Sequence, residues 1–344
     1  MVLGDFVPSS PLVNVLVVLL TPGLIWFGSG WLEESADHLA THYGLPAVVQ
    51  GSIIVALGSS FPEFASVTIA AAAGVFDMGV GAIVGSAIFN ILVIPALSGL
   101  ASEGDLETSR LVVYKEAQFY MVAVATLVVT FSLAVIYFPE PNAPPLTGQI
   151  TRPLALIPLF LYGLYLFIQW QDVSDYDGGG EGVDDGIARE WGRLLVGLLI
   201  ILVGVDLLVG SVESLSRTFG VPTFLSGITI IAAATSLPDT LVSVRSATNG
   251  NSATSLGNVL GSNTFDLLVA IPVGVLIVGS VPVDFAVAVP MLGVLTLATV
   301  LLFGMLRTDL SLTRGEAYGL MLSYLVFVAW IVTETIGLTN LIQN

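Results

Sequence analysis

Apolar stretches long enough to cross a lipid bilayer recur along the whole chain. A transmembrane helix needs about 20 mostly apolar residues, because the hydrocarbon core of a bilayer is about 30 Å thick. Hydropathy places ten such stretches at residues 11–31, 45–74, 79–101, 111–137, 151–170, 191–211, 222–249, 254–278, 283–306 and 316–338. Only 10% of the residues are charged, whereas soluble domains carry about a quarter. We therefore predict an all-α polytopic membrane protein of about ten transmembrane helices and exclude a soluble globular domain.

The basic residues indicate how these helices are oriented, because positive charges gather in the cytoplasmic loops of helical membrane proteins. With ten spans and an extracellular N-terminus, Arg152 and Arg217 face outward. The other basic residues then lie on the cytoplasmic side: Arg110, Lys115, Arg189, Arg193, Arg245, Arg307 and Arg314. We expect a multi-pass protein of the cell membrane with both termini extracellular. The first apolar stretch lacks the basic region and cleavage site of a signal peptide.

The most polar connection is an acidic, glycine-containing segment at residues 171–190. It divides the chain into two halves of five spans each, residues 1–170 and residues 191–344. The segment lacks the ligand spacing of an EF-hand, so we interpret it as a solvated cytoplasmic linker rather than a Ca²⁺ loop.

Acidic residues outnumber basic ones by 26 to 9, which gives a net charge of −17. This balance argues against nucleic acids and other anionic partners and favours cationic substrates, although adaptation to a high-salt habitat would give the same composition. The chain has no cysteine, which excludes disulfides, iron–sulfur clusters and thiolate metal sites. No cofactor is expected.

The two halves repeat one another. The run GSSFPEFASV at residues 58–67 aligns with ATSLPDTLVS at 234–243, and GSAIFNILV at 85–93 aligns with GSNTFDLLV at 261–269. Both alignments have the same offset of 176 residues, with no gap between them. Five spans, an odd number, separate the copies, so the second copy enters the membrane from the opposite side. Such inverted repeats are typical of secondary transporters, whose binding sites lie near the bilayer midplane where the repeats meet.

Each first motif places a carboxylate directly after a proline inside a long apolar helix, as Pro62–Glu63 and Pro238–Asp239. Proline lacks the backbone N–H, so it leaves a carbonyl one turn earlier without its helical partner. Carboxylates at membrane depth are costly and usually functional. Together with the neighbouring hydroxyls, these groups form an all-oxygen site, which is the ligand set that Ca²⁺ and other hard cations prefer.

The helix that follows each motif supplies further oxygens. Ser86 and Asn90 are four residues apart, as are Ser262 and Asp266, so each pair lies on one helical face. Glycines at the same spacing, Gly81 with Gly85 and Gly257 with Gly261, are interpreted as close packing positions rather than ligands.

These paired motifs resemble the alpha repeats of the cation/calcium exchanger superfamily, which includes the sodium/calcium exchangers. The resemblance covers residues 45–100 and 221–276. It implies a secondary active antiporter, not an enzyme, that exchanges Na⁺ for Ca²⁺ by alternating access, with the first and sixth helices sliding over the core. It also implies residue roles: Glu63 and Asp239 as principal Ca²⁺ ligands, Ser59 and Thr235 completing that shell, flanking Na⁺ sites from Ser60, Ser236, Ser86, Ser262 and the carbonyls of Ala56 and Ala232, and a second-helix polar pair of Asn90 and Asp266.

Two positions depart from the ordinary exchanger pattern. Asp239 stands where many members have glutamate, and Ala87 stands where asparagine is usual. The combination is most similar to the potassium-dependent sodium/calcium exchangers, in which the aspartate that matches Asp266 is linked to K⁺ use. K⁺ co-transport is therefore a hypothesis that the sequence leaves open.

Three alternative functions are weighed against this one. A Ca²⁺/H⁺ or other divalent cation antiporter would use the same scaffold, although the serine hydroxyls favour Na⁺. A zinc protease needs a glutamate directly after the first of its two histidines, and the pair His38 and His42 has none there. An aspartyl protease that used Asp239 and Asp266 would leave Glu63 without a role. A purely structural protein does not explain duplicated carboxylates.

Overall fold

The computed structural model describes residues 10–43, 56–110, 112–173 and 186–339. Eight helical spans in this part of the chain are long and apolar enough to cross a membrane. They are α1 (Pro11–His42), α5 (Phe76–Ala101), η3–α6 (Val112–Tyr137), α7 (Arg152–Val173), α8 (Ile187–Phe219), α12–η5–α13 (Ser252–Val278), α14 (Phe285–Leu306) and α15 (Arg314–Thr335). The expectation of an all-α polytopic membrane fold is confirmed.

Two broken helices carry the proline motifs, and the one in the second repeat counts as a ninth span among the described residues. In the second repeat, α9 (Thr223–Ser226), η4 (Gly227–Ile231) and α10 (Ala232–Thr235) are followed by α11 (Leu237–Thr248), with a bend of 45° at the break. In the first repeat, α3 (Ala56–Ser59) is followed by α4 (Phe61–Ala72). The start of the predicted span 45–74 lies outside the described residues.

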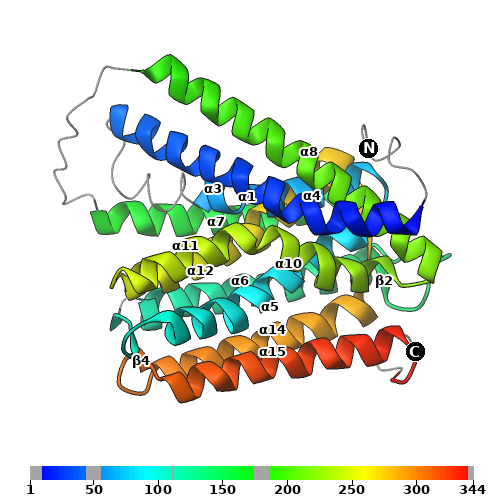
Figure 1. Cartoon of the computed structure of the whole chain (residues 1–344). Coiled ribbons are helices and arrows are strands. Elements are labelled where there is room, and N and C mark those ends of the chain that lie inside the picture. Colours follow the sequence, from blue (N-terminus) through cyan, green and yellow to red (C-terminus); the bar gives the residue numbers. More distant parts are fainter. Residues whose placement is uncertain (1–9, 44–55, 111, 174–185, 340–344) are drawn as a thin grey trace.

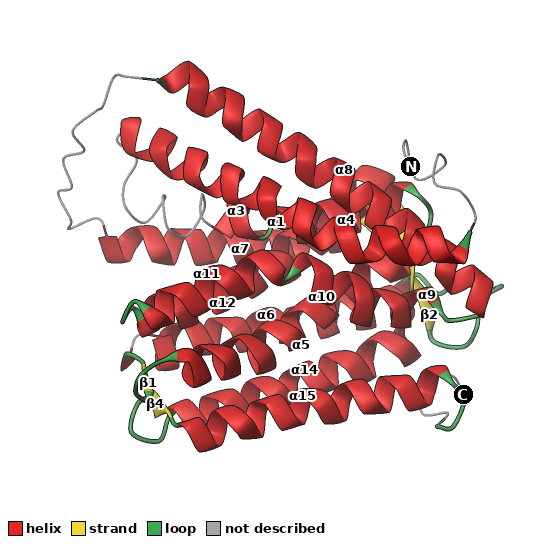
Figure 2. Cartoon of the chain, in the orientation of Figure 1, coloured by secondary structure: helices red, strands yellow, loops and turns green. Residues whose placement is uncertain are grey.

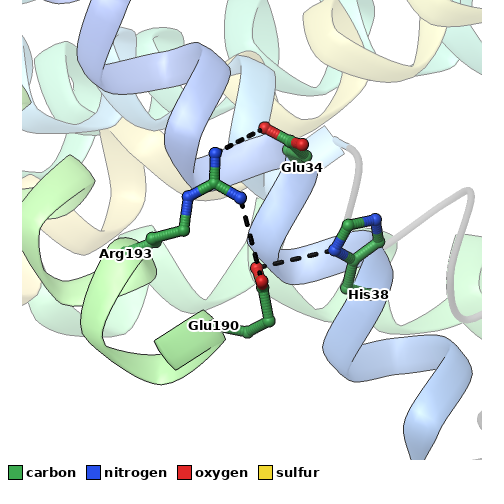
Figure 3. A network of polar contacts seen from close by, with 4 residues as sticks. All are labelled: Glu34, His38, Glu190 and Arg193. Carbon is green, nitrogen blue, oxygen red and sulfur yellow. Dashed lines mark hydrogen bonds and ion pairs between the residues drawn. The ribbon is translucent and has the colours of Figure 1, made fainter. Parts of the chain in front are cut away.

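The helices α1 and α8 are longer than the sequence predicts. We expected spans at 11–31 and 191–211, but α1 continues to His42 and α8 covers Ile187–Phe219. The extra turns are polar, and ion pairs join the end of α1 to the start of α8: Arg193 contacts Glu34 at 3.1 Å, and His38 contacts Glu190 at 3.5 Å (Figure 3). Within α8, Arg193 also contacts Glu190 at 3.7 Å. Hydropathy marks where the apolar stretch stops, not where the helix ends. The segment predicted as a linker, 171–190, is likewise shortened by helix at both ends.

Short antiparallel strand pairs join loops at opposite ends of the molecule. At one end β1 (Leu106–Glu107) pairs with β4 (Ser311–Leu312), and at the other β2 (Thr147–Thr151) pairs with β3 (Ser280–Asp284) (Figure 2). α1 begins and α15 ends at the same end as β2 (Figure 1). Each pair joins one loop from each half of the chain, and these loops are the ones expected to share a side of the membrane.

The broken helices and α5 form the interior of the bundle. The pair α1 and α8 crosses obliquely over one side, and α14 and α15 cover the other (Figure 1). α5 approaches the opposite repeat so closely that a Cβ atom at Gly85 would overlap the Ile228 carbonyl oxygen, and one at Gly81 would lie 2.5 Å from that of Phe224. The interpretation of these two glycines as packing positions therefore agrees with the structure. A Cβ atom at Gly257 or Gly261 would meet nothing from another part of the described structure within 4 Å, so the interpretation of these two glycines as close packing positions is wrong.

Candidate cation site

Both proline motifs break their helices at a serine. Ser60 separates α3 from α4, and Ser236 separates α10 from α11. The prolines occupy the first turn of the second segment, where their missing N–H costs least. That turn also contains Glu63 in α4 and Asp239 in α11, and both are almost completely buried, at 1% and 0% exposure. The breaks therefore place two carboxylates at helix N-termini, where the helix dipole favours negative charge.

The two repeats hold their carboxylates with equivalent hydrogen bonds. Ser86 on α5 donates to Glu63 Oε1 at 3.4 Å, and Ser262 on α12 donates to Asp239 Oδ1 at 3.1 Å. Each donor lies 23 positions after its acceptor in the sequence. The inverted symmetry read from the motifs is therefore present in the side-chain contacts of the site.

Further contacts cross between the repeats. The Ser59 and Ser262 hydroxyls lie 3.1 Å apart, and those of Ser86 and Ser236 lie 2.7 Å apart. All four serines are fully or almost fully buried. The second helix of each repeat thus contacts the break of the other repeat, and the two motifs form one site.

The equivalence ends at the polar pair of the second helices. Asn90 donates to Asp239 Oδ2 at 3.2 Å. At the equivalent place in the other repeat is Asp266, whose negative charge is opposed by those of Glu63 and, to a smaller extent, Asp239. Asp239 thus receives an amide N–H from one second helix, whereas the other second helix has a carboxylate in the place of that amide.

Five oxygen atoms of this cluster are buried without a hydrogen-bond partner among the described residues. They are Ser60 Oγ, Glu63 Oε2, Asn90 Oδ1 and both carboxylate oxygens of Asp266. Buried polar atoms nearly always have partners, because an unpaired one costs on the order of 1–3 kcal/mol. Such a set of oxygens can hold hard cations, which would neutralise the facing carboxylates.

The remaining predicted ligands lie beside this cluster. Thr235 is fully buried at the end of α10, and its hydroxyl donates to the carbonyls of Ile231 at 3.1 Å and Ala232 at 3.4 Å. The Ala232 carbonyl also accepts from the Ser236 N–H at 3.1 Å. Ala56 is the first residue of α3. The structure brings the predicted residues of both motifs to the breaks and the two helices beside them.

Asn263 is a site residue that the sequence analysis does not select. Its side chain accepts from Asn90 Nδ2 at 3.0 Å and donates to the Ala87 carbonyl at 3.2 Å and to Tyr120 Oη at 3.3 Å. It therefore fixes the amide that contacts Asp239. Its position directly after Ser262 was a usable signal, but its repeat partner is Ala87, which has no polar side chain.

The family model described as "Sodium/calcium exchanger protein" matches residues 13–171 and 190–333. The chain belongs to the sodium/calcium exchanger family. This exchanger-family chain is 26% identical over 350 residues to the sodium/calcium exchanger MaX1 of Methanosarcina acetivorans, covering 92% of this chain and 97% of that protein. It is 23% identical over 337 residues to human sodium/potassium/calcium exchanger 5, covering 68% of this chain and 64% of that one.

A solved structure of the sodium-calcium exchanger NCX_Mj has the same fold. The TM-score is 0.63 at 22% sequence identity, and the match covers 93% of this chain and 99% of that one. Among the residues described in this exchanger-family chain, no three His, Asp or Glu side chains are grouped so that they could hold a metal ion by themselves. Any cation in its site would therefore need hydroxyl, amide or carbonyl oxygens in addition to carboxylates.

Proposed function

We propose that the protein is a secondary active antiporter that exchanges Na⁺ for Ca²⁺ across the cell membrane. The observation that carries the proposal is the buried cluster of unpartnered oxygens between the two helix breaks. Membership of the exchanger family supports it. The protein would act as a carrier, not as an enzyme.

Ca²⁺ would bind chiefly to Glu63 and Asp239, with oxygens of Ser59 and Thr235 completing its shell. Na⁺ would occupy flanking sites that share these two carboxylates. The other ligands of those sites would be the hydroxyls of Ser60, Ser236, Ser86 and Ser262 and the carbonyls of Ala56 and Ala232. Because the buried carboxylates cannot stay charged without cations, either ion favours the ionised site. Because Na⁺ and Ca²⁺ would share the same two carboxylates, binding of one ion would exclude binding of the other. Exclusive binding is the condition for coupled exchange.

Alternating access would come from movement of α1 and α8 relative to the core. These two helices pack mainly on each other, and Figure 1 shows them crossing over one side of the bundle. Toward the core, α1 contacts α3 and α4 of one broken helix and α10 and α11 of the other. Opposite half-sites of the inverted repeats would then be opened in turn.

The test is uptake of radiolabelled Ca²⁺ into proteoliposomes with an imposed Na⁺ gradient. We expect uptake by the wild type, a loss of more than about 100-fold in Glu63→Gln and in Asp239→Asn, because each removes a charged ligand, and normal uptake by Asp105→Asn. Asp105 is an exposed carboxylate outside the site. Uptake that follows a pH gradient without Na⁺ would instead establish the Ca²⁺/H⁺ antiporter, and no uptake under either gradient would contradict Ca²⁺ exchange.

A further inference from the structure

Glu33, on α1, lies against the broken helix of the first repeat. A Cβ atom at Gly58 would lie 3.0 Å from Glu33 Cγ and 3.8 Å from Glu33 Cβ. Gly58 is in α3, two residues before the break at Ser60. The Glu33 side chain therefore lies directly on the segment that leads to the candidate site, although it belongs to neither repeated motif.

None of the ion pairs among the described residues includes Glu33. Glu33 as a residue is half-buried, but its Oε1 is buried with no hydrogen-bond partner in the described part of the chain, and its negative charge is opposed by that of Asp239. The adjacent Glu34 differs: its side chain is 51% exposed and is paired with Arg193 at 3.1 Å (Figure 3). Two neighbouring glutamates thus face opposite environments, one toward the surface ion pairs and one toward the site.

The position of Glu33 also breaks the symmetry of the repeats. The offset of 176 residues that relates the motifs relates Glu33 to Val209 of α8, which is completely buried. Because the repeats are inverted, these two positions flank opposite approaches to the site. The carboxylate therefore lies on only one approach, at the face of the membrane where α1 ends.

We propose that Glu33 is an additional cation ligand, which binds the transported ion transiently on its way between that face and Asp239. This inference rests on the proposed cation antiport. A cation between the two carboxylates would remove their repulsion and satisfy the unpartnered oxygen. A buried oxygen without a partner is costly, and a bound cation would remove that cost. Because Glu33 belongs to α1, its distance to the site would change whenever α1 moves.

The test compares the two faces of the membrane. Everted vesicles expose the face where α1 is proposed to end, and right-side-out vesicles expose the other, so Na⁺-driven Ca²⁺ uptake is measured in both. For Glu33→Gln we expect the half-saturating Ca²⁺ concentration to rise about three- to tenfold in everted vesicles only, as for loss of one partly screened charge interaction. Glu33→Asp should give a smaller rise. The matched control, Glu34→Gln, should equal the wild type in both preparations.

Equal Ca²⁺ dependence of Glu33→Gln and the wild type, or equal changes at both faces, would overturn the inference. Absence of flux in the wild type would instead overturn the proposed function. In that case thermal stabilisation of the purified proteins by Ca²⁺ still tests Glu33. Glu33→Gln should need more Ca²⁺ than Glu34→Gln for the same rise in Tm, and equal requirements would contradict the proposal. Melting without Ca²⁺ reports whether each variant is folded.

Discussion

At the scale of single residues, the site is symmetric in position but not in charge. The two serine–carboxylate contacts are equivalent, at Glu63 and at Asp239. The second-helix pair differs, because Asn90 donates an N–H to one carboxylate whereas Asp266 presents only acceptors to the other. An additional negative charge is therefore concentrated around Glu63. This is the place where a further monovalent cation would be bound most favourably.

We predict that Asp266→Asn uncouples Ca²⁺ uptake from K⁺. The substitution gives Glu63 an amide donor of the kind that Asp239 already has, so the negative charge that K⁺ would balance disappears. Uptake in Na⁺-loaded proteoliposomes, measured with and without K⁺ on the Ca²⁺ side, should depend on K⁺ in the wild type and become independent of it in the variant. Asp105→Asn serves as the control. A wild type indifferent to K⁺, or a variant that keeps the dependence, would exclude this role of Asp266.

The sequence predicted the paired residues of this site because both motifs occur twice at one offset. It did not predict their partners. Asn263 contacts Asn90 through a fold in which residues 173 positions apart meet, and its repeat partner Ala87 hides the polarity of the position. Glu33 was missed for a related reason, since it has no counterpart in the second repeat and its contact with Gly58 arises only when α1 crosses over α3.

At the scale of elements, α1 and α8 pack tightly against each other. A Cβ atom at Gly28 would lie 3.0 Å from the Gly197 carbonyl oxygen, and one at Gly197 would lie 2.8 Å from that of Gly28. Such close backbone packing needs glycine on both helices. At the helix ends, Arg193 joins Glu34 across the pair. Since the two helices share this contact and pack less on the core, movement of the pair as one body is the least costly rearrangement.

We predict that a cross-link between α1 and the core stops transport, whereas one between α1 and α8 does not. Glu33→Cys with Gly58→Cys places two Cβ atoms about 3.8 Å apart, within the range of about 3.5–4.5 Å found in disulfides. The control pair replaces Asn14 and Ser214, whose side chains are hydrogen-bonded at 3.0 Å between α1 and α8. Because the chain has no native cysteine, the introduced pair is the only one that can form a disulfide in each variant.

For each pair we measure Na⁺-driven Ca²⁺ uptake before and after reduction of the disulfide and take the ratio. Because Glu33 is absent in both measurements, the direct effect of losing it cancels in this ratio. Reduction should restore uptake in the first pair and change little in the second. Full uptake by the oxidised first pair would contradict movement of α1 over the core.

At the scale of the whole molecule, the loops at each end show how the ten predicted spans are threaded. The pairing of β1 with β4 requires residues 106–107 and 311–312 to lie on one side, and the pairing of β2 with β3 requires 147–151 and 280–284 to lie on one side. The spans predicted from hydropathy satisfy both conditions. Hydropathy could predict this order because each crossing is set by the bilayer, whereas it could not predict the polar helix ends that project beyond it.

The distribution of basic residues leads to the last prediction, that β4 lies at the cytoplasmic face and β2 at the outer face. Thr308 and Asn142 are exposed residues in the loops at these two ends, and neither contributes to the candidate site. In intact cells a membrane-impermeant maleimide should label Asn142→Cys but not Thr308→Cys, and the reverse should hold in everted vesicles. Seven of the nine basic residues face the cytoplasm in this arrangement, and in the inverted one they would face outward, against the usual bias. Labelling of Thr308→Cys in intact cells would reverse the orientation and would also move the Glu33 approach to the outer face.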